Sequence, residues 1–388
     1  MKTTPYSRQY IDSKDIKYVS KALKEDIITT GKYVKKFEDK FIKFFQSKHV
    51  LTCSSGTSAL HLAFASINLK KDDVVIMPAI NFIAAYSMAK LMNARIFLAD
   101  TDYLTGQMTP ITLLECIKKN KIKKIKAVVN MYLGGYPENI INFYKIKKKY
   151  NFFLIEDACH ALGAKYKFKE KYINIGSCKH SDIAVFSLHP VKTITSGEGG
   201  VITTNNTILY NRQKLLRSHC IIRENKEEHW KYEINKIGFN YRLSDINCAL
   251  GLSQFTKINK FINFRKKIFN IYRSKLKTIN NLISFPTYNK NYKPAYHLFI
   301  ISINFKEIKA TKDKLLKLFK KAGIFCQYHY IPIYKFNLFQ EKIDLKHYKG
   351  AEYYYKNSLS LPIFYNLGFV YQKKILSLIK VFLNRHSN

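Results

Sequence analysis

The sequence has no long apolar run and no start typical of an exported protein. No stretch of about 18 consecutive apolar residues occurs, which excludes an ordinary membrane-spanning helix. The opening residues, MKTTPYSRQYIDSKDI, lack the apolar segment of a signal peptide. We therefore expect a cytoplasmic protein that has no membrane partner.

Cysteines are few and are not arranged in pairs. The seven cysteines lie at positions 53, 116, 159, 178, 220, 248 and 326, and no two of them form a CxxC motif. An odd number of cysteines without such a motif argues against both a disulfide framework and a zinc site. We expect reduced, mostly buried thiols and no metal site.

Acidic residues are scarce, because 27 Asp and Glu stand against 66 Lys and Arg, giving a formal net charge of +39. Nucleic-acid-binding proteins usually gather basic residues in a patch or an arm. Here the lysines are dispersed, as at 118–126 and 145–149, and Ile, Asn, Tyr and Phe, which share A/T-rich codons with Lys, are also abundant. A base-composition bias therefore explains the charge better than a nucleic-acid partner, although a basic nucleic-acid-binding or regulatory protein remains an alternative. A positive field would also attract small molecules that carry phosphate.

The chain is long and apolar enough for a large domain and a smaller one, with 388 residues of which 47% are hydrophobic. Apolar runs predict strands at 50–53, 74–77, 95–99, 127–130, 152–156, 183–186 and 201–204. Amphipathic patterns predict helices at 12–26, 34–45, from 59 onward, and at 82–92, 137–150 and 206–218. Continuous apolar strands that alternate with helices indicate an α/β fold with a mainly parallel sheet covered on both faces. Ligands of such sheets bind at the carboxyl ends of the strands.

The C-terminal part follows a different pattern. A long helical region from about 245 to 273 should link two domains, followed by a strand at 295–304 and helices at 312–322 and 370–382. We expect residues 1–265 to form an N-terminal arm and a large domain. Residues 266–388 should form a smaller α+β domain.

One stretch, SLHPVKTITSGEGG at 187–200, places a single lysine, Lys192, between two predicted buried strands. A lysine that is held and partly desolvated loses proton affinity and can attack a carbonyl. The alternative is a surface lysine in a hairpin, which is plausible in a chain this rich in lysine.

Three further features should lie near Lys192 at the carboxyl edge of the sheet. The small residues of SSGT at 54–57 precede a helix and would leave N–H groups free for a phosphate, although SSGT is also an ordinary helix cap. Asp157 ends a buried strand, where a carboxylate needs a cationic partner. The carboxylate could serve in a structural ion pair or as a helix cap, or it could pair with the ring nitrogen of a pyridine cofactor. His160, three residues further on, would reach the same ring. With Phe82 as an aromatic that stacks on the ring, these are the parts of a pyridoxal 5'-phosphate (PLP) site.

Five motifs, SSGTSAL, EDACHALGA, FSLHPVK, GEGG and NYRLSD, occur in an order and spacing that resembles the DegT/DnrJ/EryC1/StrS family of sugar-nucleotide aminotransferases. The resemblance covers nearly the whole chain. It implies PLP fold type I, as in aspartate aminotransferase, and a homodimer whose active sites are shared between subunits.

The same resemblance implies roles for individual residues. Lys192 would form the Schiff base with PLP, Asp157 would pair with the pyridine nitrogen, His160 would lie near the 3-hydroxyl, and Phe82 would stack on the ring. Gly56, Thr57 and Ser187 would bind the phosphate, together with Asn240 of the neighbouring subunit.

Within the family, the chain start and the segments at 189–192, 216–219 and 327–334 look most similar to the branch that serves pseudaminic acid synthesis, surface polysaccharides and flagellin glycosylation. That branch moves an amino group, usually from glutamate, to C4 of a UDP-linked 4-keto-6-deoxy-N-acetylhexosamine, and Tyr6 and His329 would line the sugar-nucleotide pocket. A perosamine- or bacillosamine-type aminotransferase is the alternative. Relatives that dehydrate the sugar carry a histidine in place of Lys192, which argues against dehydration. The chain departs from the usual family residues at Asn81, Ala85, Thr193 and Cys220, and these departures loosen the substrate assignment.

Overall fold

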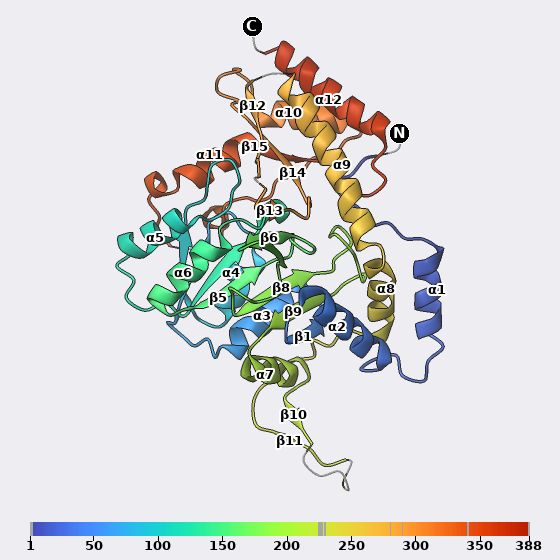
Figure 1. Ribbon diagram of the computed structural model, residues 1–388. Helices are drawn as coiled ribbons and strands as arrows, with labels where there is room; N and C mark the ends of the chain where they lie inside the picture. Colours follow the sequence, from blue (N-terminus) through green and yellow to red (C-terminus); the bar gives the residue numbers. More distant parts are fainter. Residues whose placement is uncertain are drawn as a thin grey trace.

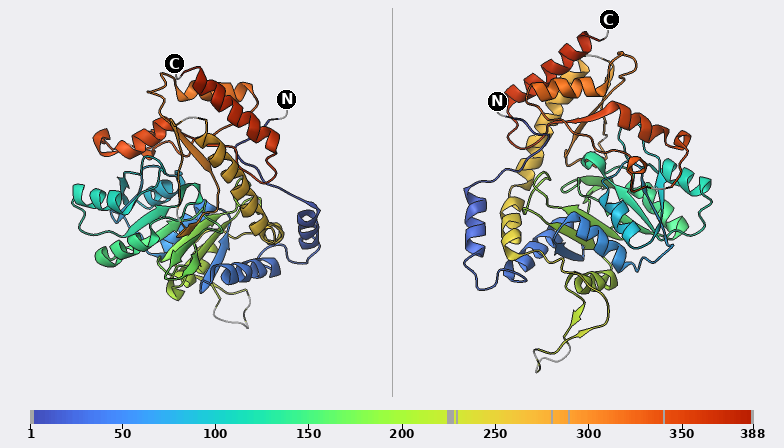
Figure 2. Two further views of the ribbon diagram at one scale, coloured as in Figure 1. Left: turned by 45° about the horizontal axis from the view of Figure 1, so that its top comes forward. Right: turned by 180° about the vertical axis from the view of Figure 1, so that it is seen from behind.

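The computed structural model describes residues 3–223, 228, 230–279, 281–288, 290–339 and 341–386 (Figure 1). The chain folds as a large α/β layer below a smaller layer of helices and short strands, and both termini lie at the smaller layer (Figures 1 and 2). No helix within the described ranges combines the length and the apolar character needed to cross a membrane.

A seven-stranded sheet, in the order β1-β9-β8-β5-β4-β2-β3, forms the centre of the large domain. Neighbouring strands from β3 through β8 pair in parallel, whereas β9 pairs antiparallel with both β8 and β1. The predicted mainly parallel sheet is therefore confirmed, with β9 as the reversed strand. The bounds are β1 His49–Cys53, β2 Val74–Pro78, β3 Arg95–Ala99, β4 Ala127–Met131, β5 Phe153–Asp157, β8 Ile183–Ser187 and β9 Gly200–Thr204.

Both faces of this sheet are buried, which is why its strands are continuous apolar runs. Alternate residues of β4 show this: Val128 packs into one apolar cluster and Val129 into the other. Helices α2, α5, α6 and α8 contribute to the first cluster, and α3, α4 and α7 to the second. The bounds are α2 Lys32–Phe45, α3 Gly56–Ser66, α4 Ala84–Leu91, α5 Pro110–Lys119, α6 Ile140–Tyr150, α7 Thr207–Arg217 and α8 Asp245–Phe255.

A third apolar cluster forms the core of the smaller layer, around the antiparallel sheet β12-β14-β15 and helices α9, α10 and α12. The bounds here are α9 Ile258–Lys277, β12 Ile283–Ser284, β14 Phe299–Ile303, α10 Lys312–Lys321, α11 Lys349–Asn357, β15 Ser358–Leu361 and α12 Phe369–Asn384. The remaining elements are α1 Ser13–Ala22, β6 Lys165–Phe168, β7 Lys171–Asn174, β10 Ile221–Ile222, β11 Glu233–Ile234, β13 Tyr292–Lys293 and the 3-10 turns Leu133–Gly135, Ile333–Lys335 and Leu345–His347.

The predicted long helical region is two helices, because α8 ends at Phe255 and α9 begins at Ile258. Between them Lys257 turns inward, and its Nζ lies 2.6 Å from Asp15 Oδ2 and 3.0 Å from Asp12 Oδ1 on the N-terminal segment. Helix α9 then runs to Lys277, beyond the predicted end, and connects the large layer to the small one (Figure 1). The domain boundary at 265/266 remains a prediction, and it falls inside this helix.

Candidate active site

Loops that follow β1, β2, β5 and β8 meet at the carboxyl edge of the sheet, where they surround a cavity of about 660 Å³. Segments 327–331 and the N-terminal arm close its other side. Nine of the ten residues predicted for the site line this cavity: Tyr6, Gly56, Thr57, Phe82, Asp157, His160, Ser187, Lys192 and His329. The structure therefore brings together residues that are far apart in the sequence.

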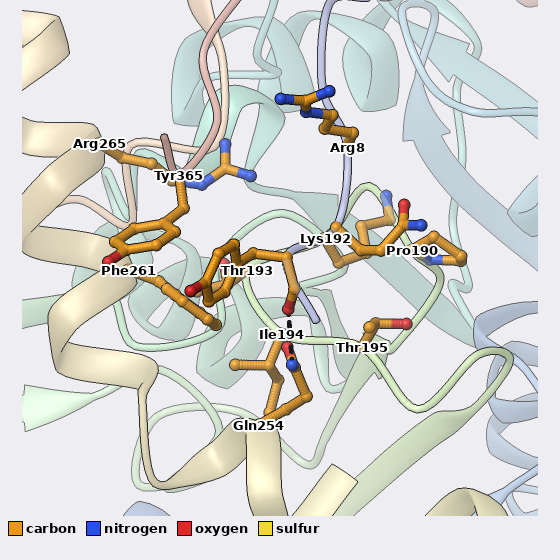
Figure 3. Close-up of a pocket in the computed structure, with 12 residues that line it drawn as sticks. Arg8, Pro190, Lys192, Thr193, Ile194, Thr195, Gln254, Phe261, Arg265 and Tyr365 are labelled. Carbon is orange, nitrogen blue, oxygen red and sulfur yellow. Dashed lines mark hydrogen bonds between the residues drawn. The ribbon is translucent and has the colours of Figure 1, made fainter. Parts of the chain in front are cut away.

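Lys192 lies in a loop whose two ends are the paired strands β8 and β9, with Ser187 opposite Gly200. Leu188, at the start of the loop, joins it to the returning arm through two backbone hydrogen bonds. Its N–H donates to Gly199 O at 2.8 Å, and its carbonyl accepts from Ser196 N at 3.0 Å. A pocket behind the loop is lined by the N-terminal arm, α8 and α9, and Figure 3 shows these segments around Lys192. The hydrogen-bonded loop thus holds Lys192 at the wall of the cavity.

Charge and burial oppose each other at this lysine. Burial lowers the pKa of Lys192, and the nearby Cys159 and Asp157 partly counteract that effect, whereas Arg265 adds to it. Burial also raises the pKa of Asp157, which is only 3% exposed and accepts a hydrogen bond from Cys159 N at 3.2 Å. The site thus contains an amine whose pKa is lowered and a carboxylate that forms no ion pair among the described residues.

The start of α3 forms the floor of the cavity. The Ser55 side chain caps the helix by accepting from Ser58 N at 3.1 Å. The N–H groups that precede Ser58 in the first turn have no intrahelical acceptor, as at the start of any α-helix. A Cβ atom at Gly56 would lie 3.0 Å from Ser187 Cβ, so only glycine leaves this floor uncrowded. Free N–H groups and the positive end of a helix dipole form a site for a phosphate.

His160 lines the cavity, is almost fully buried, and is fixed by two hydrogen bonds. Its Nδ1 accepts from Gly134 N at 3.3 Å, so the proton of the neutral ring belongs on Nε2, which lies 3.0 Å from Tyr330 OH. Burial lowers the pKa of His160 well below its usual value, an effect that the charge of Lys192 reinforces. Phe82 lies at the cavity mouth with 51% of its surface exposed, and its ring centroid is 5.6 Å from that of Tyr330.

On the opposite wall, Tyr6 packs edge-on against His329 with 5.1 Å between ring centroids. His329 Nδ1 lies 2.9 Å from Ser360 Oγ, and burial lowers the pKa of His329 to about 3. His329 is therefore a neutral hydrogen-bonding group at physiological pH.

Asn240 does not line the cavity. It is exposed and forms an isolated bridge with Ser218, so the predicted role of Asn240 at a neighbouring subunit's phosphate stays a prediction. Among the departures from the family pattern, Asn81 lines the cavity and Thr193 is buried behind it. Cys220 has a φ of 55°, a backbone region that favours the glycine expected there.

Tyr330 and Cys159 are cavity residues to which the sequence assigned no role. Tyr330 belongs to the segment at 327–334 that carries part of the family resemblance, but the resemblance implies no role for the tyrosine itself. Cys159 lies between the assigned Asp157 and His160, and it lines the cavity as a half-buried thiol. Proximity in sequence to an assigned residue was the available signal in both cases.

The arrangement fits PLP on three observations. Lys192 offers an amine of lowered pKa, Asp157 is a buried carboxylate suited to a pyridinium nitrogen, and the start of α3 offers unpaired N–H groups to a phosphate. No group of three His, Cys, Asp or Glu side chains suited to a metal ion occurs within the described ranges.

Comparison with known proteins agrees with this geometry. Residues 9–380 match the DegT/DnrJ/EryC1/StrS aminotransferase family. A UDP-4-amino-4,6-dideoxy-N-acetyl-beta-L-altrosamine transaminase from Campylobacter jejuni strain 81-176 is 35% identical over 357 residues, covering 92% of this chain and 91% of that protein. A GDP-perosamine synthase from Escherichia coli O157:H7 is 32% identical over 340 residues, covering 86% of this chain and 88% of that protein.

Solved structures give the same result. An aminotransferase from Helicobacter pylori involved in the biosynthesis of pseudoaminic acid superposes with a TM-score of 0.88 at 28% identity, covering 99% of this chain and all of that one. A sugar aminotransferase from Streptococcus pneumoniae in its PLP form superposes with a TM-score of 0.89 at 24% identity over 99% of both chains, which supports the fold. The chain therefore belongs to the DegT/DnrJ/EryC1/StrS aminotransferase family and is a PLP-dependent sugar aminotransferase.

Proposed function

We propose that this enzyme moves an amino group from L-glutamate to C4 of a UDP-linked 4-keto-6-deoxy-N-acetylhexosamine. The product would be UDP-4-amino-4,6-dideoxy-N-acetyl-beta-L-altrosamine, used for pseudaminic acid and surface glycans, including those of flagellin. The observation that carries the proposal is the 35% identity, over 92% of the chain, to a Campylobacter enzyme named for this reaction. A second Campylobacter relative of the same name is 34% identical over the same share.

The proposed chemistry assigns a distinct task to each part of the cavity. When bound, PLP supplies the electron-withdrawing ring that allows an amino group to pass between an amino acid and a keto sugar. Lys192 would hold the cofactor and move protons at the reacting carbon, for which a low proton affinity is an advantage. Asp157 would keep the pyridine nitrogen protonated, and neutral His160 would orient the ring as a hydrogen-bonding group.

The substrate would lie between the ring-stacking Phe82 and the wall formed by Tyr6 and His329. A neutral His329 can both donate and accept a hydrogen bond, which suits a sugar or uracil edge better than a second fixed charge would. The cavity volume of about 660 Å³ is within the range that small-molecule sites occupy.

The test is incubation of the purified enzyme with glutamate and a panel of UDP-, dTDP- and GDP-linked 4-keto sugars, with products identified by mass and NMR. We expect amination at C4 of the UDP-N-acetyl sugar. Lys192→Ala should lose both turnover and the visible absorbance of the bound cofactor, whereas Lys124→Ala, at an exposed lysine, should retain both. Full turnover of Lys192→Ala would refute the assigned role of Lys192, and amination at C3 would refute the assigned position.

A perosamine-type activity is the second candidate, because the E. coli GDP-perosamine synthase is almost as similar to this chain. The same panel separates the two, since preferred turnover of the GDP-linked keto sugar would favour this candidate. The proposal further includes a cytoplasmic homodimer in which Asn240 reaches the phosphate site of the neighbouring subunit.

A further inference from the structure

Arg265 is a buried arginine outside the cavity wall, at the second turn of α9. Only 2% of its surface is exposed, and in the described part of the chain no carboxylate forms an ion pair with it. Its guanidinium instead donates to neutral oxygens: Nη1 to His297 O at 3.0 Å and Ile363 O at 2.8 Å, and Nη2 to Ser7 Oγ at 3.3 Å and Val191 O at 3.4 Å. Figure 3 shows the side chain reaching from α9 toward the loop of Lys192.

Three of the four acceptors, on Ser7, Val191 and His297, adjoin residues of the candidate site. Val191 O belongs to the peptide bond that precedes Lys192, and Ser7 Oγ also donates to this carbonyl at 3.0 Å. The His297 ring packs against the His160 ring with 4.2 Å between centroids. One guanidinium thus joins the N-terminal arm, the Lys192 loop and the small domain.

Burying the positive charge of Arg265 destabilises the folded state, so its presence calls for a compensating role. Burying a cation without an anionic partner carries a desolvation penalty that hydrogen bonds to carbonyls offset only in part. Burial lowers the pKa of Arg265 to about 10, so the side chain is still charged at neutral pH. A neutral side chain would fill the same space at lower cost if packing were the sole requirement.

The positive charge also acts on Lys192, because a nearby cation disfavours a second one. The other charged or titratable groups that face the Lys192 amine are Asp157, Cys159, His160, His297 and His329. Among the groups that face this amine, Arg265 is a cation that is still charged at neutral pH.

We propose that Arg265 is a positioning residue of the aminotransferase site, which fixes the Val191–Lys192 peptide against the arm and the small domain and places an unneutralised positive charge near the Lys192 amine. This role holds for whichever keto sugar is the substrate. It is therefore independent of the UDP-sugar proposal.

The test uses the PLP-loaded enzyme with Arg265→Met, Arg265→Lys and the control Lys266→Met, which removes an exposed charge from the neighbouring position. The pH titration of the visible absorbance reports protonation at the bond between Lys192 and the cofactor. We expect its midpoint to rise by about one pH unit in Arg265→Met, because a repelling cation is lost. Arg265→Lys should leave the midpoint of the pH titration unchanged, because the positive charge is retained. Its kcat should fall about 10-fold, because lysine lacks the planar guanidinium that donates to four acceptors. Lys266→Met should have the same titration midpoint and the same kcat as the parent enzyme.

A purely structural arginine would behave differently. Melting temperatures would fall, but the midpoint and the kcat per loaded site of folded Arg265→Met would stay at the parent values, and this result would overturn the proposal. If Arg265→Met does not fold, Ser7→Ala decides, since it removes one of the two donors to Val191 O and leaves the charge in place. We expect its kcat to fall about 5-fold with an unchanged midpoint, and a parental kcat would contradict the proposal.

Discussion

At the scale of single residues, the surroundings of Asp157 differ from those of a structural carboxylate. It is buried at the end of β5, its pKa is raised by that burial, and the hydrogen bonds that it accepts in the described structure come from Cys159. A structural carboxylate in the same chain, Asp245, accepts from the N–H groups of Gly31, Tyr33 and Val34 at the start of α2. This contrast is the one expected if the pyridine nitrogen of the cofactor pairs with Asp157.

Asp157→Asn should therefore have opposite effects on stability and on activity. In the cofactor-free protein the raised pKa means that the ionised carboxylate destabilises the folded state at high pH, so removing the charge at pH 8 should raise the melting temperature by about 2 °C. Turnover of the loaded enzyme should fall at least about 100-fold, because a neutral amide cannot hold the pyridine nitrogen protonated. Calorimetry of the free protein and steady-state kinetics check the two effects. A lower melting temperature of the free variant would identify Asp157 as a structural carboxylate.

Candidate site residues were predictable where a motif marks them, whereas a buried residue outside a motif was missed. Lys192, Asp157 and Gly56 stand in short segments whose residue types the chemistry requires. Arg265 looks like one more basic residue of a lysine-rich helix. Its signal was positional, because it occupies the apolar stripe of α9 between Phe261 and Phe269, which the helical period puts on one face.

At the scale of elements, the strands of the central sheet were predictable because both faces are buried and each strand is a bounded apolar run. The interruption between α8 and α9 was not, because it depends on Lys257 pairing with two aspartates more than 240 positions earlier in the chain. Long-range partners of this kind leave no local pattern.

Helix α10 supports the cavity from outside through Lys312 at its first turn. Its Nζ donates to Tyr355 O and to Ser358 O, at 3.2 Å for the latter, and lies 4.1 Å from the ring centroid of Tyr328. Tyr328 precedes His329 in the segment that lines the cavity. The lysine thus fixes the end of α11 and the outer side of the substrate wall.

Burial lowers the pKa of Lys312 to about 8, which predicts a pH-dependent contribution to stability. Between about pH 8 and the ordinary lysine value of about 10.4, the unfolded chain binds more protons at this group than the folded one. The loss of folding stability caused by burying the charged amine is therefore complete below pH 8 and decreases as the pH rises. The melting temperature of the parent minus that of Lys312→Met should rise by about 3 °C between pH 7.5 and pH 10.

Other lysines titrate over the same range, so a matched variant is needed. Lys314→Met removes an exposed lysine from the same helix. The melting temperature of the parent minus that of this variant should not change with pH. Parallel slopes for the two variants would mean that Lys312 has an ordinary pKa in the folded protein.

At the scale of the whole molecule, the cavity of a single chain holds few positive charges for a substrate that carries a diphosphate. Apart from Lys192, the described cavity wall contains no arginine or lysine, despite the net charge of +39. Phe82 is half exposed at the mouth, and Asn240 lies exposed elsewhere on the surface. Both features are expected if a second subunit completes the site, as the family resemblance implies.

Subunit complementation tests this arrangement directly. Lys192→Ala removes the cofactor lysine, and Asn240→Asp would place a carboxylate beside the neighbouring subunit's phosphate, so each variant alone should be nearly inactive. In co-expressed chains that pair at random, half of the dimers are mixed, and each mixed dimer holds one site with both parent residues. We therefore expect about a quarter of the parent activity in the mixture, measured as turnover per chain.

Gel filtration of each variant should show the same size as the parent, so that loss of assembly is not mistaken for loss of a site. A mixture no more active than its components would show that Asn240 serves its own chain or no site at all.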